Sequence, residues 1–151
     1  VYPTSNSVGT ALGSTSQRWV INANTINASA NVTTTGTVFA NNSVGVKSAP
    51  SISTNTLTID LAAATVFEVT LNAAISTLTI NNAQSSGYVS SFVLVFVADG
   101  TARSVTWPAS FKWPAGVAPT LTSTLNKKDA FVFFTYDGGT TWTAAIIGQN
   151  L

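Results

Sequence analysis

Few side chains in this sequence could carry out chemistry. The 151-residue chain has no His and no Cys, so the commonest general base, the thiolate nucleophile and the usual zinc ligands are missing. It has five carboxylates: Asp60, Glu68, Asp99, Asp129 and Asp137. No two of them lie close enough in sequence to suggest the carboxylate pair that a polysaccharide depolymerase, the enzymatic alternative, would need. We therefore predict no catalytic residue, no metal site and no cofactor, and we expect that the chain is not an enzyme.

The local feature best suited to ligand binding is a doubled Trp-Pro-Ala, at 107–109 and 113–115. On an exposed loop, Trp107 and Trp113 would form a stacking platform for sugar rings, and Lys112 between them would contact an acidic group. In the structural interpretation, which we favour, Trp107 instead ends a strand and plugs the open end of the fold. Large aromatic side chains are usually buried, and this supports the structural interpretation.

The remaining charged motifs are typical of turns. Asp99 and Asp137 each precede a Gly, where an Asp side chain caps its own backbone. Neither loop places several oxygen ligands at regular spacing, so calcium is not predicted. The run 127–129, Lys-Lys-Asp, predicts a solvated turn ahead of a Phe-rich strand.

The composition favours strands at an uncharged surface. Charged residues are 7% of the chain, against about 25% in ordinary domains, and the net charge of +1 indicates no nucleic-acid partner. There is no apolar run long enough for a transmembrane helix and no signal-peptide pattern, so membrane insertion is not expected. The chain starts at Val1 and lacks Met, which suggests an excised or processed product. Thr, Ser, Asn, Ala and Val dominate while Leu, Glu, Lys and Arg are few, which favours strands and turns over helices, and the 45% hydrophobic content argues against disorder.

A six-residue period runs through the N-terminal third. Five aliphatic residues fall six apart: Val20, Ile26, Val32, Val38 and Val44. One aliphatic residue per hexad is typical of a parallel β-helix or a triple-stranded fibre, and chance in an ordinary β-meander is the alternative. A single-chain β-helix uses about three hexads per turn, so five hexads make fewer than two turns, which is too few for the coils to be stable by stacking on one another. Other copies of the chain could supply the missing faces, which predicts a trimer around a common axis.

After Pro50 the pattern changes to short alternating stretches bounded by turns. The segments 56–61, 66–71 and 76–80 each predict a strand with one buried face. Two hairpins are expected, one joining 90–98 to 103–107 through Asp99-Gly100, the other joining 130–136 to 140–147 through Asp137-Gly138-Gly139. Seven or eight such strands predict an antiparallel β-sandwich.

Two of these segments are apolar on both faces. In the first, Phe92, Leu94 and Phe96 alternate with Val93, Val95 and Val97; in the second, Phe131 and Phe133 alternate with Val132, Phe134 and Tyr136. An antiparallel strand with one wet face should alternate with polar residues instead. The second face therefore needs a cover, which is either a neighbouring subunit or a loop of the same chain.

Several motifs resemble a known family. The segments 106–116, 118–122 and 134–142 and the ending 148–150 resemble the C-terminal domain of tailed-phage virion proteins, particularly tail-fibre and baseplate-associated proteins of marine phages. The segment 12–19, ending in Trp19, looks like a short element of phage fibre chains, although no aromatic residue follows at the usual place. The resemblance covers about the last hundred residues. It implies a trimeric fibre component exposed on the virion that contacts the host surface, and it supplies no binding residues.

The sequence thus predicts an all-β homotrimer in three parts: an N-terminal segment (1–19), an intertwined triple-stranded hexad-repeat β-stalk (20–49) and a C-terminal β-sandwich (50–151). The expected location is the virion surface, and the expected partners are further copies, other virion proteins and host-surface polysaccharide. Two alternatives are a carbohydrate-binding, lectin-like module and a capsid decoration or head-fibre protein.

Overall fold

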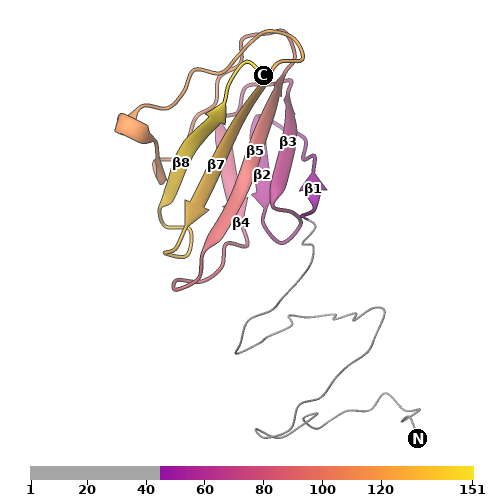
Figure 1. Cartoon of the computed structure of the whole chain (residues 1–151). Coiled ribbons are helices and arrows are strands. Elements are labelled where there is room, and N and C mark those ends of the chain that lie inside the picture. Colours follow the sequence, from indigo (N-terminus) through magenta and orange to yellow (C-terminus); the bar gives the residue numbers. More distant parts are fainter. Residues whose placement is uncertain (1–44) are drawn as a thin grey trace, which may run out of the picture. The chain divides into compact units, whose positions relative to one another are not determined.

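The computed structural model describes residues 45–151 (Figure 1). The segment 1–19 and the five hexad residues from Val20 to Val44 lie outside the described residues, so the stalk and its trimer axis stay predictions. What the structure describes is mostly β-structure, with no α-helix between residues 45 and 151. The all-β class is therefore confirmed for this part of the chain.

The described residues form two sheets. The larger has six strands in the order β1-β3-β5-β7-β8-β6, and the smaller pairs β2 with β4. The elements are β1 (Lys47–Ser48), β2 (Thr56–Asp60), β3 (Val66–Leu71), β4 (Thr77–Asn81), β5 (Ser90–Ala98), β6 (Phe111–Lys112), the 3-10 turn η1 (Pro114–Gly116), β7 (Lys128–Thr135) and β8 (Trp142–Gly148).

Strands β2, β3 and β4 form where alternation predicted them. In β2, Leu57 and Ile59 are fully buried and Thr58 between them is exposed. β3 and β4 repeat this pattern, because period-2 alternation places every second side chain on the core side of a pleated strand. The predicted strands at 56–61, 66–71 and 76–80 are thus confirmed to within a residue or so at their ends.

The predicted antiparallel arrangement is wrong for much of the fold. β1 runs parallel to β3, β3 to β5, β2 to β4 and β6 to β8; only β5–β7 and β7–β8 are antiparallel. From β1 to β5 the chain alternates between the two sheets (Figure 1). Each strand therefore has as its neighbour the strand two places along, which runs in the same direction. Turn signals in the sequence mark where a strand ends but not which sheet the next strand joins.

One predicted hairpin forms and the other does not. β7 and β8 pair antiparallel across 136–141, as expected. β5 does not pair with 103–107: Val105 makes only an isolated parallel bridge to Ile75, and β7 takes the antiparallel place beside β5. The β5–β7 pairing sets Phe92 opposite Phe133, with ring centroids 4.9 Å apart, an apolar contact that 103–107 could not supply.

The core lies on one side of the six-stranded sheet, under two different covers. β2 and β4 contribute Leu57, Ile59 and Leu78 to the same buried cluster as Phe67 and the rest of β3. Over β7 and β8, the cover is the segment 105–121, which is mostly loop with the short β6 and η1 inside it and carries Trp107, Phe111 and Trp113. The sandwich is therefore completed by a second sheet on one half and by an aromatic loop on the other.

The sheet begins before the predicted boundary at Pro50. Lys47 and Ser48, which fall within the predicted stalk at 20–49, form β1 and pair with Val66 and Phe67. These residues are an edge strand of the sandwich, because they complete hydrogen bonding along β3.

Candidate interaction surface

The structure places Trp107 and Trp113 within the core. Trp113 is 8% exposed and Trp107 is partly buried, with their ring centroids 4.8 Å apart in an edge-to-face contact. Both indoles also contact Phe131 and Phe133 at centroid distances of 5.6–6.0 Å. The exposed stacking platform that the carbohydrate hypothesis needs is not formed by this pair.

The loop that carries the two Trp residues is built from tight turns. The Phe111 backbone N–H donates to the Pro108 carbonyl oxygen, and the Gly116 N–H donates to the Trp113 carbonyl oxygen, both at 2.9 Å. Lys112 lies on the exposed side, and its Nζ donates to the Ala109 carbonyl oxygen at 2.8 Å. Lys112 therefore helps close its own loop and is separated from the buried faces of the indoles.

Three carboxylates cap turns, as the sequence indicated for two of them. Asp60, Asp99 and Asp137 each accept a hydrogen bond from a backbone N–H two or four residues ahead, at 2.9 Å. Each also has a side-chain donor, and the pKa of each carboxyl lies below its ordinary value. The main causes are the Asn82 amide for Asp60, the Arg103 guanidinium for Asp99 and the Thr141 backbone N–H for Asp137.

Asp129 corrects the prediction of a solvated turn at 127–129. It is 2% exposed, and its carboxylate accepts hydrogen bonds from the Thr122 N–H and Oγ1 and from the Asn150 N–H, at 2.6, 2.7 and 3.0 Å. Asp129 is buried because alternate side chains of a strand share a face. β7 begins at Lys128, so Asp129 faces the same side as Phe131. Counting back from the Phe residues would have found this position. The carboxylate ties the loop before β7 to the C-terminal end of the chain.

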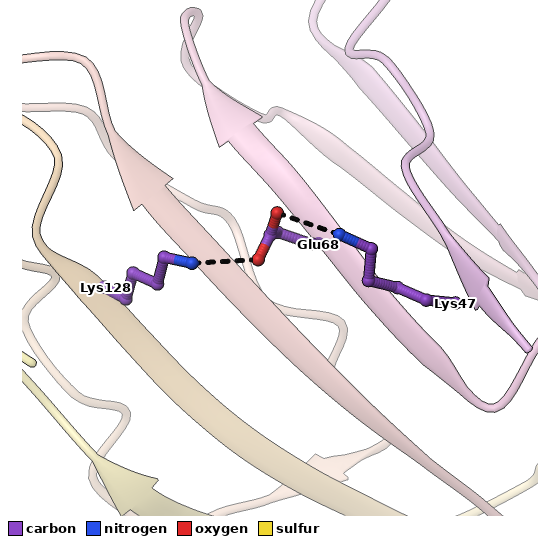
Figure 2. Close-up of polar contacts among 3 residues, drawn as sticks. All are labelled: Lys47, Glu68 and Lys128. Atoms are coloured by element: carbon purple, nitrogen blue, oxygen red, sulfur yellow. Dashed lines mark hydrogen bonds and ion pairs between the residues drawn. The ribbon is translucent and has the colours of Figure 1, made fainter. Parts of the chain in front are cut away.

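Glu68 lies on the opposite side of the sheet, between two lysines (Figure 2). Its two carboxylate oxygens accept hydrogen bonds from Lys47 Nζ at 3.2 Å and Lys128 Nζ at 3.0 Å. Lys128 extends across β5 to reach Glu68 on β3, so three strands are bridged. The hydrogen bond from Lys128, followed by that from Lys47, holds the pKa of Glu68 below its ordinary value of 4.5.

This side of the sheet, which we call the outer face, is apolar at its centre. It consists of the outward side chains of β3, β5, β7 and β8, namely Val66, Glu68, Thr70, Ser91, Val93, Val95, Val97, Lys128, Ala130, Val132, Phe134, Thr143 and Ala145. One row crosses all four strands in register, from Val66 through Val93 and Val132 to Ala145. Phe134 stands one pair further along and is 39% exposed. The second apolar face of β5 and β7 is therefore real, and within residues 45–151 it remains partly exposed.

No cluster typical of a metal site accompanies this face. Across the described residues, no three acidic side chains gather where they could hold an ion. Residues 45–151 also contain no helix with the length and apolar character that crossing a membrane would require.

No family model matches the chain, and neither a curated protein nor a solved structure was found to be similar to it.

Proposed function

We propose that this chain is a structural module of a phage virion, a homotrimeric tail-fibre or baseplate-associated component at the particle surface that contacts the host cell. The virion context comes from the motif resemblance at 106–116 and 134–142. The observation that carries the structural role is the outer face, because an apolar sheet face of this kind marks a surface that packs against another protein.

The state of the carboxylates supports a non-enzymatic role. All five lie within the described residues, and every one is engaged by donors that hold a turn, an ion pair or the C-terminal end. The pKa values of Asp60, Glu68, Asp99 and Asp137 lie below their ordinary values. A glycosidase needs one carboxyl with a raised pKa to act as general acid, so this pattern favours structural roles.

The fold suits a structural module. Eight strands are joined by mixed pairing, and the C-terminal end is tied back onto β7 by reciprocal backbone hydrogen bonds between Lys128 and Leu151, at 3.0 and 3.2 Å. In this proposal the hexads from Val20 to Val44 supply the trimer axis, and the sandwich is the globular part that the axis carries.

Two alternatives share parts of this case. A capsid decoration or head-fibre protein would use the same fold and the same outer face. A carbohydrate-binding module would need contacts other than Trp107 and Trp113, since these two residues pack against Phe131 and Phe133.

Native mass spectrometry of the full chain tests the oligomer. The expected mass is three times the 15.6 kDa of one chain, and a stable monomer would refute the proposal.

Immunogold labelling of intact phage particles with an antibody against residues 45–151 tests the location, with label at the tail expected. Label on the capsid would favour the decoration alternative, and a glycan array without binding would remove the carbohydrate module.

A further inference from the structure

We propose that the outer face is the surface through which copies of this chain pack together, with the outer faces of three sheets turned toward one axis. The inference rests on the proposed homotrimer, and adds to it which surface of the sandwich is buried and what covers it. The occupant is a second and a third copy of the same face.

The arrangement of the face supports an apolar occupant. The row Val66, Val93, Val132 and Ala145 forms its centre, and the next row adds Val95 and Ala130 from β5 and β7. A wet sheet face would carry polar residues at these positions, whereas these rows are apolar and, apart from the buried Ala130, only half-buried within residues 45–151. They therefore have the composition of a packed interface.

The charges of the face fit a copy better than a charged partner. Its only carboxylate, Glu68, is already bound by Lys47 and Lys128 along one border. Lys47, Glu68 and Lys128 together carry a net charge of +1, but the row from Val66 to Ala145 carries no charge. Two identical faces can therefore meet with apolar rows against apolar rows, about 10 Å apart, without burying an unpaired ion.

The position at which residues 1–44 connect to the sandwich also supports packing through the outer face. Residues 1–44 connect to the sandwich just before β1, the edge strand of this sheet, and the Lys47 side chain lies on the outer face beside Glu68. The segment that carries the predicted trimer axis is therefore attached at the border of the outer face.

The size of the face explains why the N-terminal segment is needed as well. Four strands about 4.8 Å apart, over about six residues of 3.3 Å each, give a face on the order of 400 Å². A stable interface buries about 800 Å² on each partner. The outer face thus supplies about half of the contact, and the hexads must supply the rest.

The test uses cysteine cross-linking of the full chain, which has no native Cys to interfere. Val132→Cys places a thiol at the centre of the outer face, and Thr58→Cys places a matched thiol on the exposed side of β2 in the other sheet. Under mild oxidation or with a short bismaleimide, Val132→Cys is expected to give covalent dimers, and Thr58→Cys is expected to stay uncross-linked. Equal cross-linking of both variants, or none at position 132, would overturn the inference.

A second pair of variants tests the same surface by mass. Val132→Glu should weaken assembly by about tenfold or more, because it buries a charge between apolar rows, while Thr58→Glu should leave the mass unchanged. Circular dichroism and Trp fluorescence show whether Val132→Glu has kept its fold, and if it has not, the cysteine pair decides. A wild-type trimer that stays trimeric with folded Val132→Glu refutes the chosen surface and leaves the proposed trimer standing. If the wild type is a monomer, both the chosen surface and the proposed trimer are refuted. The outer face is then covered by residues 1–44 of its own chain or by an unlike protein.

Discussion

The two faces of the six-stranded sheet can be compared at consecutive residues of β7. Phe133 points to the inner face, is 0% exposed and stacks on Phe92, whereas Phe134 points to the outer face and is 39% exposed. The two residues have the same type and nearly the same place in the chain. Residue type alone therefore does not decide burial, since the inner face has two covers within residues 45–151 and the outer face has none.

The two faces also differ in how they hold an acidic side chain: the inner face buries one, and the outer face leaves one in contact with solvent. Asp129 is enclosed on the inner side with three hydrogen bonds, while Glu68 on the outer side keeps contact with solvent through its two lysines. A buried carboxylate must be saturated with donors, and an exposed one need not be. The two acidic residues therefore stabilise the domain by different means, and mutations should separate them.

The largest effect is expected from Phe133→Ala. This change removes a ring that contacts Phe92, Phe111 and both core Trp residues, and leaves a cavity. The free energy of unfolding should fall by about 3–5 kcal/mol, measured by denaturant titration with Trp fluorescence at fixed protein concentration. Phe133→Leu, which keeps much of the volume, is the control and should lose clearly less. A loss below about 1 kcal/mol for the Ala variant would contradict the assignment of Phe133 to a tightly packed core.

Asp129→Ala should be the next most damaging change. It removes the acceptor of two partly buried hydrogen bonds, from the N–H groups of Thr122 and Asn150, and an unsatisfied buried group costs about 1–3 kcal/mol. We expect a loss of about 2–4 kcal/mol in the free energy of unfolding, together with faster hydrogen exchange at Leu151. Asp129→Asn keeps one acceptor oxygen and is expected to lie between wild type and the Ala variant. Unchanged exchange at Leu151 would show that the C-terminal end is held without this carboxylate.

Phe134→Ala should have an effect that depends on protein concentration, unlike Phe133→Ala. In dilute solution, where copies separate, the loss should be well below that of Phe133→Ala, since the ring is already partly solvated. At higher concentration the gap between wild type and Phe134→Ala should widen, because assembly stabilises the folded state by mass action. Unfolding midpoints measured over a hundredfold range of concentration test this. A constant gap would mean that Phe134 takes no part in assembly.

Glu68→Gln should have the smallest effect at neutral pH, less than about 1 kcal/mol and reduced by salt, since both ion pairs are solvent-accessible. A clearer effect is expected on the way in which the stability of the protein falls as the pH is lowered. The pKa of folded Glu68 lies below the ordinary 4.5, so its pairs stabilise the protein above that pH and are lost as the pH falls through the lowered value. The wild type should therefore lose stability more steeply than Glu68→Gln below about pH 4.5. Parallel curves in thermal melts from pH 6 to pH 3 would contradict the ion-pair assignment.

Local patterns along the chain were enough to predict several elements. Alternation located β2, β3 and β4, and the Asp137-Gly138-Gly139 turn identified the β7–β8 hairpin. The apolar second face of β5 and β7 was also visible, because two-sidedness is a property of consecutive residues. The same kind of local pattern around Asp99-Gly100 failed to find the partner of β5, since a turn sets a change of direction and not a pairing.

Other features of the fold depend on contacts between residues distant in the sequence. The parallel pairing of β1, β3 and β5 arises because β2 and β4 lie in the other sheet, and no local signal carries that information. Trp107 and Trp113 are core residues, not a surface platform, because β7 brings Phe131 and Phe133 beneath them. Propensity and alternation act over a few neighbouring residues, whereas burial depends on which distant strand lies opposite. For this reason most of the longer strands could be located from the chain alone, whereas their partners, apart from the β7–β8 hairpin, could not.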